Sequence, residues 1–428
     1  MEKKQSSLPP SPLISLPILI FFYIGLISII YQSNIIKLLK KLSKVLYCFN
    51  KVNGNEKMEF SMKIEKISLY RVCNPIKHPY TTAFGTQTAF DSILVRLDSE
   101  GLSGWGEAAP GGGPFFSYQT APVSFMIARD FIIPRLLHRE IASPEELQKL
   151  LEPIRGHEFA KAAFDVAFWD LLCRKRNLPL KEGIGGTKEK AEIGYCFGVL
   201  ADFDELIAGI DRVTRAGYPR VKLKFCPGWE CDMLDAVRSV YPDLTIHIDC
   251  NSAYTLDDLP MLKSLDKYHL AMIEQPLMHD DLIDHAKLQK QIGTPVCLDE
   301  SICSLQDARQ AIEIGACGYI NVKYARVGGI TPSLAILRLC GETGTGCWLG
   351  GMGESSLGTT VVANLCTLPQ VNYPSDISPA DKFYVENLGM PVLTTDQPGT
   401  YTLRNRPGLD TVPNPGVLAK YQQEEYSA

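Results

Sequence analysis

Several residue types and motifs are scarce or absent in this 428-residue chain, and each absence removes a class of function. The seven histidines form no HxxH or HExxH spacing, and the thirteen cysteines form no CxxC pair, so the usual zinc-site motifs are missing. A net charge of −5 leaves no basic surplus for binding nucleic acid. The scattered, odd-numbered cysteines indicate buried free thiols in a reducing compartment rather than a disulfide framework.

The first 57 residues also lack alanine, aspartate and arginine, all of which are abundant in the remainder. Residues 13–31 form an uncharged apolar run of about 19 residues, which is long enough to span a membrane. More lysines follow this run than precede it, so a genuine span would leave the main body in the cytoplasm, tethered to the inner face of the membrane. The missing residue types favour a mis-assigned translation start over a genuine span, and a processed segment is the third alternative.

Residues 58–190 are predicted to form an α+β capping domain. Alternating apolar residues in 62–97 and 102–109 predict an antiparallel meander. The segment 74–87 is interpreted as a polar loop between the first two strands. The Gly-rich and aromatic segment 110–120 lacks a P-loop pattern and is interpreted as a mobile loop over a substrate.

Helical periodicity follows the meander in three segments, 119–137, 143–153 and 157–175. The last segment is rich in alanine and is interpreted as an amphipathic helix packed against a sheet or barrel. Its polar residues Asp165, Trp169 and Asp170 are expected to pack and cap rather than to catalyse.

Residues 191–390 change to a repeat of short apolar runs and helix-like segments, which predicts a (β/α) barrel of the TIM type with seven or eight strands. The candidate strands are 191–200, 220–225, 245–250, 271–276, 295–300, 319–324, 347–352 and 371–378. The tail 391–428 has alternating runs broken by Pro and Gly and is expected to return to the capping domain.

Five ionisable residues recur at one phase of this repeat. Lys224, Asp249, Glu274, Asp299 and Lys323 are separated by 25, 25, 25 and 24 residues, each in or just after a candidate strand. Parallel strands of a barrel end at the same mouth, so these side chains are expected to converge there. Each residue alone could be a strand-end cap or an ion-pair partner, whereas the set predicts a site.

Three carboxylates without histidine or cysteine make an all-oxygen ligand set, which suits Mg²⁺, with Mn²⁺ as the alternative. A divalent cation would also relieve the repulsion among three buried carboxylates. The two lysines would flank a substrate held at the cation. This arrangement fits removal of a proton next to a carboxylate, with stabilisation of the resulting enediolate.

The motifs around these residues resemble a known family. They are KLKFCPGW, DCNSAYT, MIEQPL, CLDESI, NVKYARVGG and WLGGMGESSLG. They resemble the muconate-lactonising subgroup of the enolase superfamily, and within it the o-succinylbenzoate synthase and N-succinylamino acid racemase family. The resemblance extends over roughly Met62 to Gly416.

The resemblance implies a role for each matching residue. Lys224 and Lys323 would be the acid/base pair, and Asp249, Glu274 and Asp299 would bind Mg²⁺. Four further residues would contact the substrate carboxylate or the surroundings of the metal: Lys222, Asn251, Gly351 and Met352. Arg326 would support the site from the layer behind it.

The resemblance implies dehydration of 2-succinyl-6-hydroxy-2,4-cyclohexadiene-1-carboxylate, with racemisation of N-succinyl amino acids as the alternative. A small carboxylate substrate and a homo-oligomer are expected, and no nucleic-acid partner. A membrane-tethered binding module without turnover is the non-enzymatic alternative. Gly353 departs from the family pattern, as do the three glycines and Gln119 in the segment 110–120, and both departures are expected to affect the substrate pocket.

Overall fold

The computed structural model describes residues 61–82, 85–111, 113–200, 202–377, 383–395 and 397–428, and Met62–Ala428 form one compact unit. The predicted extension 1–57, with its apolar run 13–31, lies outside the described residues. Among the described residues, no helix combines the length and the apolarity that crossing a bilayer requires.

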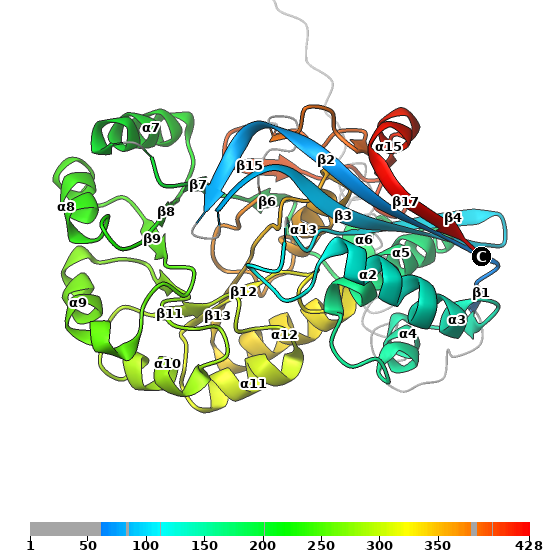
Figure 1. Ribbon diagram of the computed structural model, residues 1–428, viewed down its shortest axis with the longest axis horizontal. Helices are drawn as coiled ribbons and strands as arrows, with labels where there is room; N and C mark the ends of the chain where they lie inside the picture. Colours follow the sequence, from blue (N-terminus) through cyan, green and yellow to red (C-terminus); the bar gives the residue numbers. More distant parts are fainter. Residues whose placement is uncertain (1–60, 83–84, 112, 201, 378–382, 396) are drawn as a thin grey trace, which may run out of the picture. The chain divides into compact units, whose positions relative to one another are not determined.

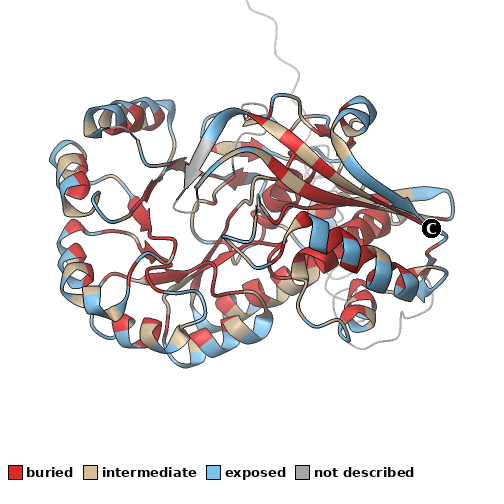
Figure 2. Ribbon diagram, viewed as in Figure 1, coloured by how far each residue is buried: buried red, intermediate tan, exposed pale blue. Residues whose placement is uncertain are grey.

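A curled sheet of seven parallel strands forms the barrel part of this unit, as predicted (Figure 1). The strands pair in chain order, so each new strand is added at the same edge of the sheet. They are β7 (Tyr195–Phe197), β8 (Val221–Lys224), β9 (Ile246–Asp249), β10 (Ile273–Glu274), β11 (Val296–Leu298), β12 (Tyr319–Val322) and β13 (Gly346–Leu349). All residues of the strands from β8 to β11 are buried (Figure 2).

The eighth strand position differs from a regular strand. Within the predicted segment 371–378, Asp376 makes one parallel bridge to Gly350, and Ser375 makes one to Ile193. The segment therefore lies beside both ends of the curled sheet through single bridges only. The predicted first strand 191–200 is also divided, because β6 (Lys190–Glu192) pairs with β15 (Thr400–Thr402) rather than within the barrel.

Helices follow the barrel strands and cover their outer side (Figure 1). They are α7 (Phe203–Ala216), α8 (Cys231–Val240), α9 (Leu259–Ser264), α10 (Leu282–Gln289), α11 (Leu305–Glu313), α12 (Ile330–Thr343) and α13 (Ser356–Leu365). Their ends follow ordinary capping chemistry. The Asp202 side chain accepts from Glu205 N at the start of α7, and Gly217 ends this helix with a φ of 98°.

The capping sheet has the strand order β17–β2–β3–β4 and is antiparallel throughout: β2 (Lys66–Thr82), β3 (Gly85–Ser99), β4 (Leu102–Ala108) and β17 (Gln422–Ser427). The prediction of a loop over residues 74–87 is wrong, because most of this segment belongs to the extended β2–β3 hairpin. A register irregularity between Pro75 and Tyr80 accommodates prolines that cannot donate to the ladder. Through β17, the end of the chain lies next to β2.

The three predicted helical segments of the capping region are all helical. They contain α2 (Ala121–Ile127), the π-helical turn η1 (Ala128–Ile132), α3 (Ile133–Leu136), α4 (Pro144–Leu151) and α5 (Glu158–Lys175). The prediction of an amphipathic α5 is wrong, because every residue from Phe159 to Cys173 is buried. α5 contacts β3 and β4 as well as α12, so it has no solvent-facing stripe over this stretch.

Short elements complete the described fold. They are β1 (Met62–Lys63) paired with β5 (Glu140–Ile141), β14 (Gly389–Met390) paired with β16 (Val412–Pro413), α6 (Leu180–Gly183), η2 (Leu256–Asp258), η3 (Leu265–Tyr268) and α15 (Pro415–Tyr421). All cysteines of the described ranges are free thiols.

Candidate active site

The structure brings the five periodic residues together at the carboxyl ends of neighbouring strands. In the sheet register Lys224 lies opposite Asp249, and Asp249 lies opposite Glu274. Asp299 and Lys323 directly follow β11 and β12. All five side chains are buried, which follows from their place at the interior of the barrel mouth.

Each lysine of this group lies close to a carboxylate. Lys224 Nζ is 2.8 Å from Asp249 Oδ2, and Lys323 Nζ is 2.9 Å from Asp299 Oδ2. Lys222, which is two residues before Lys224 and points to the same side of β8, has its Nζ 2.8 Å from Asp249 Oδ2 and 2.8 Å from Glu274 Oε2. We refer to these six residues as the ionic cluster.

The ionic cluster has the donor chemistry of a divalent-cation site. Among the residues that the structure describes, its carboxylates do not form a ready-made ligand group, and the Lys222 ammonium lies between two of them. Glu274 Oε2 is buried, and the Lys222 ammonium lies 2.8 Å from it. Three buried carboxylates from adjacent strands supply oxygen ligands of the kind that a hard cation prefers.

Burial and neighbouring charge shift the pKa values in this cluster in opposite directions. Burial, with a contribution from the Asp249 charge, raises the pKa of Glu274 to about 7. Burial acts in the same direction on Asp249, but the ammoniums of Lys222 and Lys224 outweigh it and hold the pKa of Asp249 below its ordinary value. The pKa of Asp299 is lowered in the same way against burial, chiefly by Lys323 and Arg326.

Arg326 lies behind the cluster, as predicted from its position in the sequence. Its guanidinium donates through Nη1 to Asp299 Oδ1, through Nε to Ile302 O at 2.8 Å, and through Nη2 to Asn321 O at 2.7 Å. These bonds fix the Asp299 carboxylate and the turn after β12 at the same time.

Asn251 lines the cavity at the barrel mouth and has a left-handed backbone conformation, with φ of 44°. Its Oδ1 accepts from Lys224 Nζ, and its Nδ2 donates to Glu300 Oε1 at 2.9 Å. Burial, followed by the charges of Asp299 and Asp249, raises the pKa of Glu300 to about 8. The Asn251 amide therefore already has partners on both sides.

Gly351 and Met352 also line the cavity, but their N–H groups have acceptors within the protein. Gly351 N donates to Asp376 O at 2.9 Å, and Met352 N donates to Glu354 Oε2 at 2.7 Å. Contacts from these residues to a substrate carboxylate stay a prediction. The turn after β13 uses these N–H groups to hold its own shape.

Sequence reasoning missed two residues that face this cluster. The Phe116 ring lies over Lys323, with Nζ 4.6 Å from the ring centroid, and comes from the segment predicted to cover a substrate. Asp376 lies 3.5 Å from Lys222 Nζ. A charged residue at the end of the candidate strand 371–378 was the available signal for Asp376, whereas the sequence gives no signal for the direction of Phe116.

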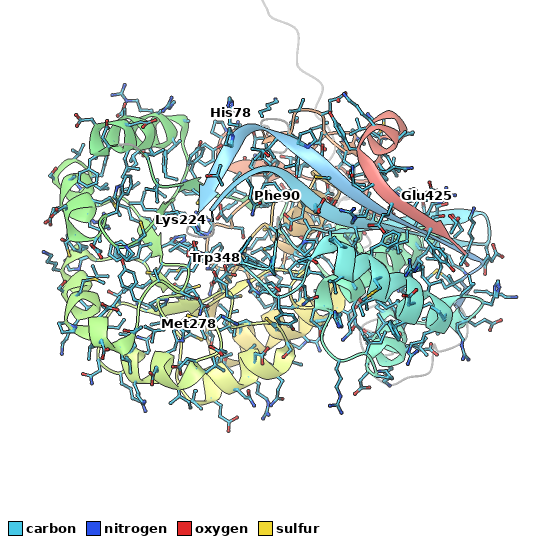
Figure 3. All side chains as sticks on the ribbon, viewed as in Figure 1. His78, Phe90, Lys224, Met278, Trp348 and Glu425 are labelled. Carbon is cyan, nitrogen blue, oxygen red and sulfur yellow. The ribbon has the colours of Figure 1, made fainter. Side chains whose placement is uncertain are left out.

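Aromatic side chains form another side of the cavity. Phe90 on β3 lies 5.4 Å from Phe383 between ring centroids, and both line the cavity together with Phe116. We refer to Phe90, Phe116 and Phe383 as the aromatic wall. Figure 3 shows Phe90 on the capping sheet and Lys224 on the barrel.

The two predicted departures from the family pattern have different surroundings. Gly353 lines the cavity with a φ of 82°, and a Cβ on it would lie 2.7 Å from the Phe90 ring, so the aromatic wall requires glycine here. Gln119 is not a lining residue. Its Oε1 accepts from Phe159 N at 3.1 Å at the start of α5, whereas Gly111 of the same loop does line the cavity.

Two buried carboxylates of the capping region, those of Asp165 and Glu107, bind the amino ends of barrel helices. Asp165 of α5 accepts from Thr331 N at 3.0 Å and from Thr331 Oγ1 at 2.6 Å, at the start of α12. Trp169 Nε1 donates to the same hydroxyl at 2.9 Å. These contacts confirm that Asp165 and Trp169 pack and cap, and Asp170 likewise accepts from Trp105 N at 2.9 Å and Leu409 N at 2.7 Å.

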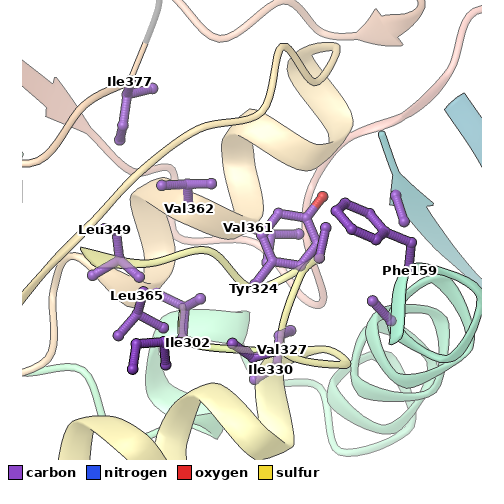
Figure 4. Close-up of a cluster of buried hydrophobic side chains, with 14 of the residues drawn as sticks. Phe159, Ile302, Tyr324, Val327, Ile330, Leu349, Val361, Val362, Leu365 and Ile377 are labelled. Carbon is purple, nitrogen blue, oxygen red and sulfur yellow. The ribbon is translucent and has the colours of Figure 1, made fainter. Parts of the chain in front are cut away.

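Glu107 on β4 makes the corresponding contacts with α13. It accepts from Ser355 N at 3.1 Å, Ser355 Oγ at 2.6 Å and Gly358 N at 2.9 Å. Tyr324, the residue after Lys323, donates through its hydroxyl to Glu107 O at 2.9 Å. Figure 4 shows Phe159 of α5 beside Tyr324, so the capping region contacts the turn after β12 through apolar packing as well.

Comparisons with known proteins identify sequence relatives over most of the chain. Residues 66–185 match the family described as "Mandelate racemase / muconate lactonizing enzyme, N-terminal domain", and residues 205–416 match the family described as "Enolase C-terminal domain-like". The o-succinylbenzoate synthase of Bacillus subtilis is 38% identical over 361 residues, which cover 84% of this chain and 97% of the relative. The N-succinylamino acid racemase of Thermus thermophilus is 39% identical over 327 residues, or 76% of this chain and 89% of the relative.

Solved structures give the same relationship in three dimensions. A member of the enolase superfamily from Listeria innocua has a TM-score of 0.83 and 35% sequence identity, and the match covers 86% of this chain and 99% of that chain. Another member, from Enterococcus faecalis, has a TM-score of 0.81 and 36% identity over 86% of this chain and 99% of that chain.

Proposed function

Because the chain belongs to the enolase superfamily, in its mandelate racemase and muconate-lactonizing branch, we propose that it is an o-succinylbenzoate synthase. The reaction is the dehydration of 2-succinyl-6-hydroxy-2,4-cyclohexadiene-1-carboxylate to 2-succinylbenzoate. Relatives from Geobacillus stearothermophilus and Enterococcus faecalis, at 40% and 37% identity, are also named o-succinylbenzoate synthase. The structural observation that carries the proposal is the placement of two lysines, from β8 and after β12, on either side of three buried carboxylates.

Asp249, Glu274 and Asp299 are proposed to hold Mg²⁺, with Mn²⁺ as the alternative. The all-oxygen donor set of three buried carboxylates from neighbouring strands supports this assignment. When bound, the cation would neutralise the substrate carboxylate and so lower the free energy of removing the neighbouring proton.

Lys224 is proposed to remove the proton from C1, next to the carboxylate, and must enter the reaction uncharged to do so. The electron pair of the broken C–H bond first delocalises into the carboxylate, giving the enediolate anion, and then forms the new ring double bond as the C6 hydroxyl departs. The proton held on Lys224 Nζ leaves with that hydroxide as water, so the lysine returns to its starting state. No other proton donor is required.

Lys323 is proposed to remain an ammonium and to stabilise the anion by its charge. The ring of Phe116 lies 4.6 Å from its Nζ, where the face of the ring attracts an ammonium group. Arg326 holds Asp299, the carboxylate partner of Lys323, and so orients both groups.

Racemisation of N-succinyl amino acids is the second candidate. It is favoured by the approach of Lys224 and Lys323 to one cavity from different strands, since a racemase needs a proton carrier on each face of the carbon. In that reaction Lys323 would exchange protons as well. The relatives from Thermus thermophilus and Amycolatopsis named N-succinylamino acid racemase support it.

A paired assay of the purified protein with Mg²⁺ tests both candidates. Dehydration of the cyclohexadiene acid is followed by the appearance of 2-succinylbenzoate, and isotope exchange at the α-carbon of N-succinyl amino acids is followed in D₂O. The synthase proposal predicts dehydration. Exchange without dehydration would favour the racemase, and neither reaction would favour a binding module. A homo-oligomer and the domain limits near residues 190 and 390 remain predictions.

A further inference from the structure

The cations that line the cavity are already engaged by carboxylates. They are Lys222, Lys224 and Lys323, and each has a carboxylate oxygen within 2.9 Å. Under the proposed function the substrate carries a second carboxylate, at the end of its succinyl chain. This remote group lies several bonds away from the reacting carbon, so it requires a partner outside the ionic cluster.

Gln87 is an uncharged polar residue that lines the cavity from the capping sheet, outside the ionic cluster. It lies on β3, three residues before Phe90, and it lines the cavity together with Phe90 and Phe383. Among the residues that the structure describes, Gln87 Oε1 is buried and has no hydrogen-bond partner.

A buried amide atom without a partner costs free energy unless a ligand or water satisfies it. The other side-chain amide in the cavity, that of Asn251, already bonds to Lys224 and Glu300. The N–H groups of Gly351 and Met352 are also used within the protein. Among the described lining residues, Gln87 therefore provides hydrogen-bonding capacity that the fold does not use.

We propose that the side-chain amide of Gln87 binds the remote carboxylate of the succinyl group. This inference rests on the proposed function and names the residue that selects succinyl compounds. Rotation of the amide by half a turn places its Nε2 donor at the buried position, where it can donate to a carboxylate oxygen. The aromatic wall next to it would exclude water from that bond and would pack against the two methylenes of the chain.

The test compares two ligands with the same benzoate and keto chain, 2-succinylbenzoate and 2-butanoylbenzoate, the second of which has a methyl group in place of the remote carboxylate. Their binding to the Mg²⁺-loaded protein is measured by calorimetry, so turnover is not needed. Wild type should bind 2-succinylbenzoate more tightly. Gln87→Leu should weaken that binding by roughly tenfold to a hundredfold and change the binding of 2-butanoylbenzoate less than about twofold.

Gln87→Glu provides a second variant that keeps the shape and the polarity of the side chain. It should weaken binding of 2-succinylbenzoate further, with a loss that shrinks at high salt, because two negative charges would then face each other. Thr88→Val, at the exposed neighbouring position, should match wild type with both ligands. Thermal unfolding of each variant checks that the fold is retained.

The outcomes separate this inference from the function it rests on. If wild type prefers 2-succinylbenzoate and both Gln87 variants keep that preference, the inference is wrong while the proposed function stands. If wild type binds neither ligand, the proposed function fails and the inference fails with it.

Discussion

In the barrel mouth, the cavity is lined by charged residues that have ionic partners. The aromatic wall and the uncharged polar residue Gln87 line the same cavity from other segments. The residues of the ionic cluster come from consecutive strand ends at a nearly constant sequence spacing. The aromatic wall instead comes from β3, from the segment after β4 and from the chain near residue 383. The difference indicates that reaction type and substrate choice reside in separate parts of the chain.

The two regions also differ in how much change they tolerate. A charge removed from the ionic cluster leaves a buried partner without compensation, which is costly. A substitution in the aromatic wall alters the shape and the apolar area of the cavity. It should therefore change the affinity for substrate more than it changes the reactivity of the catalytic groups. Each prediction below tests this division, beginning with the largest expected effect.

Removal of the divalent cation should abolish turnover. Dialysis against EDTA should reduce dehydration to the background rate, and added Mg²⁺ should restore it, because three buried carboxylates then regain their counter-charge. Dehydration is measured before and after the addition of Mg²⁺. Full activity in the presence of EDTA would remove the metal assignment.

Substitution of Lys224 or Lys323 should lower turnover by about a thousandfold or more. Lys224→Ala removes the proposed base, and Lys323→Ala removes the proposed stabilising charge. Lys323→Arg should retain more dehydration than Lys224→Arg, since charge alone is required at position 323. Steady-state kcat is the readout.

Lys290→Ala, at an exposed position on the barrel surface, is the matched control and should keep wild-type kcat. Near-wild-type turnover in both alanine variants of the ionic cluster would contradict the two-lysine mechanism. Equal losses with both arginine variants would indicate that Lys323 also carries a proton, as racemisation requires.

Phe90→Leu should raise KM by roughly fivefold to tenfold and leave kcat within about twofold, because it reduces apolar contact without touching the ionic cluster. Phe131→Leu is the matched control, since Phe131 is 49% exposed on η1, away from the cavity. A loss confined to kcat in Phe90→Leu would show that the aromatic wall acts on the chemical step, which would break the division.

Asp165 should affect stability with little effect on turnover. Burial raises its pKa from 3.8 to about 6, against hydrogen bonds from Thr331 and Gln148. Between about pH 4 and pH 6 the folded protein therefore holds a proton that the unfolded chain has lost, so the contribution of this group falls as pH rises through that window. The expected loss of unfolding free energy across this window is about 3 kcal/mol.

Asp165→Asn cannot titrate, so its unfolding free energy should lack this contribution. Urea unfolding from pH 4 to pH 7 measures the unfolding free energy of both proteins. The unfolding free energy of wild type should fall relative to that of the variant as pH rises. Asp243→Asn, at an exposed position, should follow the wild-type curve. Parallel curves for wild type and Asp165→Asn would contradict the prediction.

Sequence reasoning was strongest where residue position along a strand decides direction. The repeat near 25 residues predicted the parallel barrel and the convergence of Lys224, Asp249, Glu274, Asp299 and Lys323, because strand ends of a barrel share one mouth. It failed at 74–87, where Pro75 and the polar residues resembled a loop. Pairing with β3 supplied partners that the sequence of β2 does not reveal.

The helix α5 shows the same limit on a larger scale. Its composition suggested one apolar face, but contacts with the capping sheet and with α12 bury it on all sides. Burial of Asp165 and Asp170 is tolerated because backbone N–H groups from distant segments bind them. Those partners are more than 160 residues away for Asp165 and more than 230 for Asp170, and local pattern carries no information about them.

The sequence by itself determined the order of elements, the family and the residues of the ionic cluster, because these depend on local periodicity and on residue type. Only the tertiary structure decided which uncharged groups face that cluster. Phe90, Phe116 and Gln87 reach the cavity because the capping region is fixed to the barrel by buried carboxylates and apolar packing. Their direction depends on contacts between segments far apart in the chain, and no short stretch of sequence specifies it.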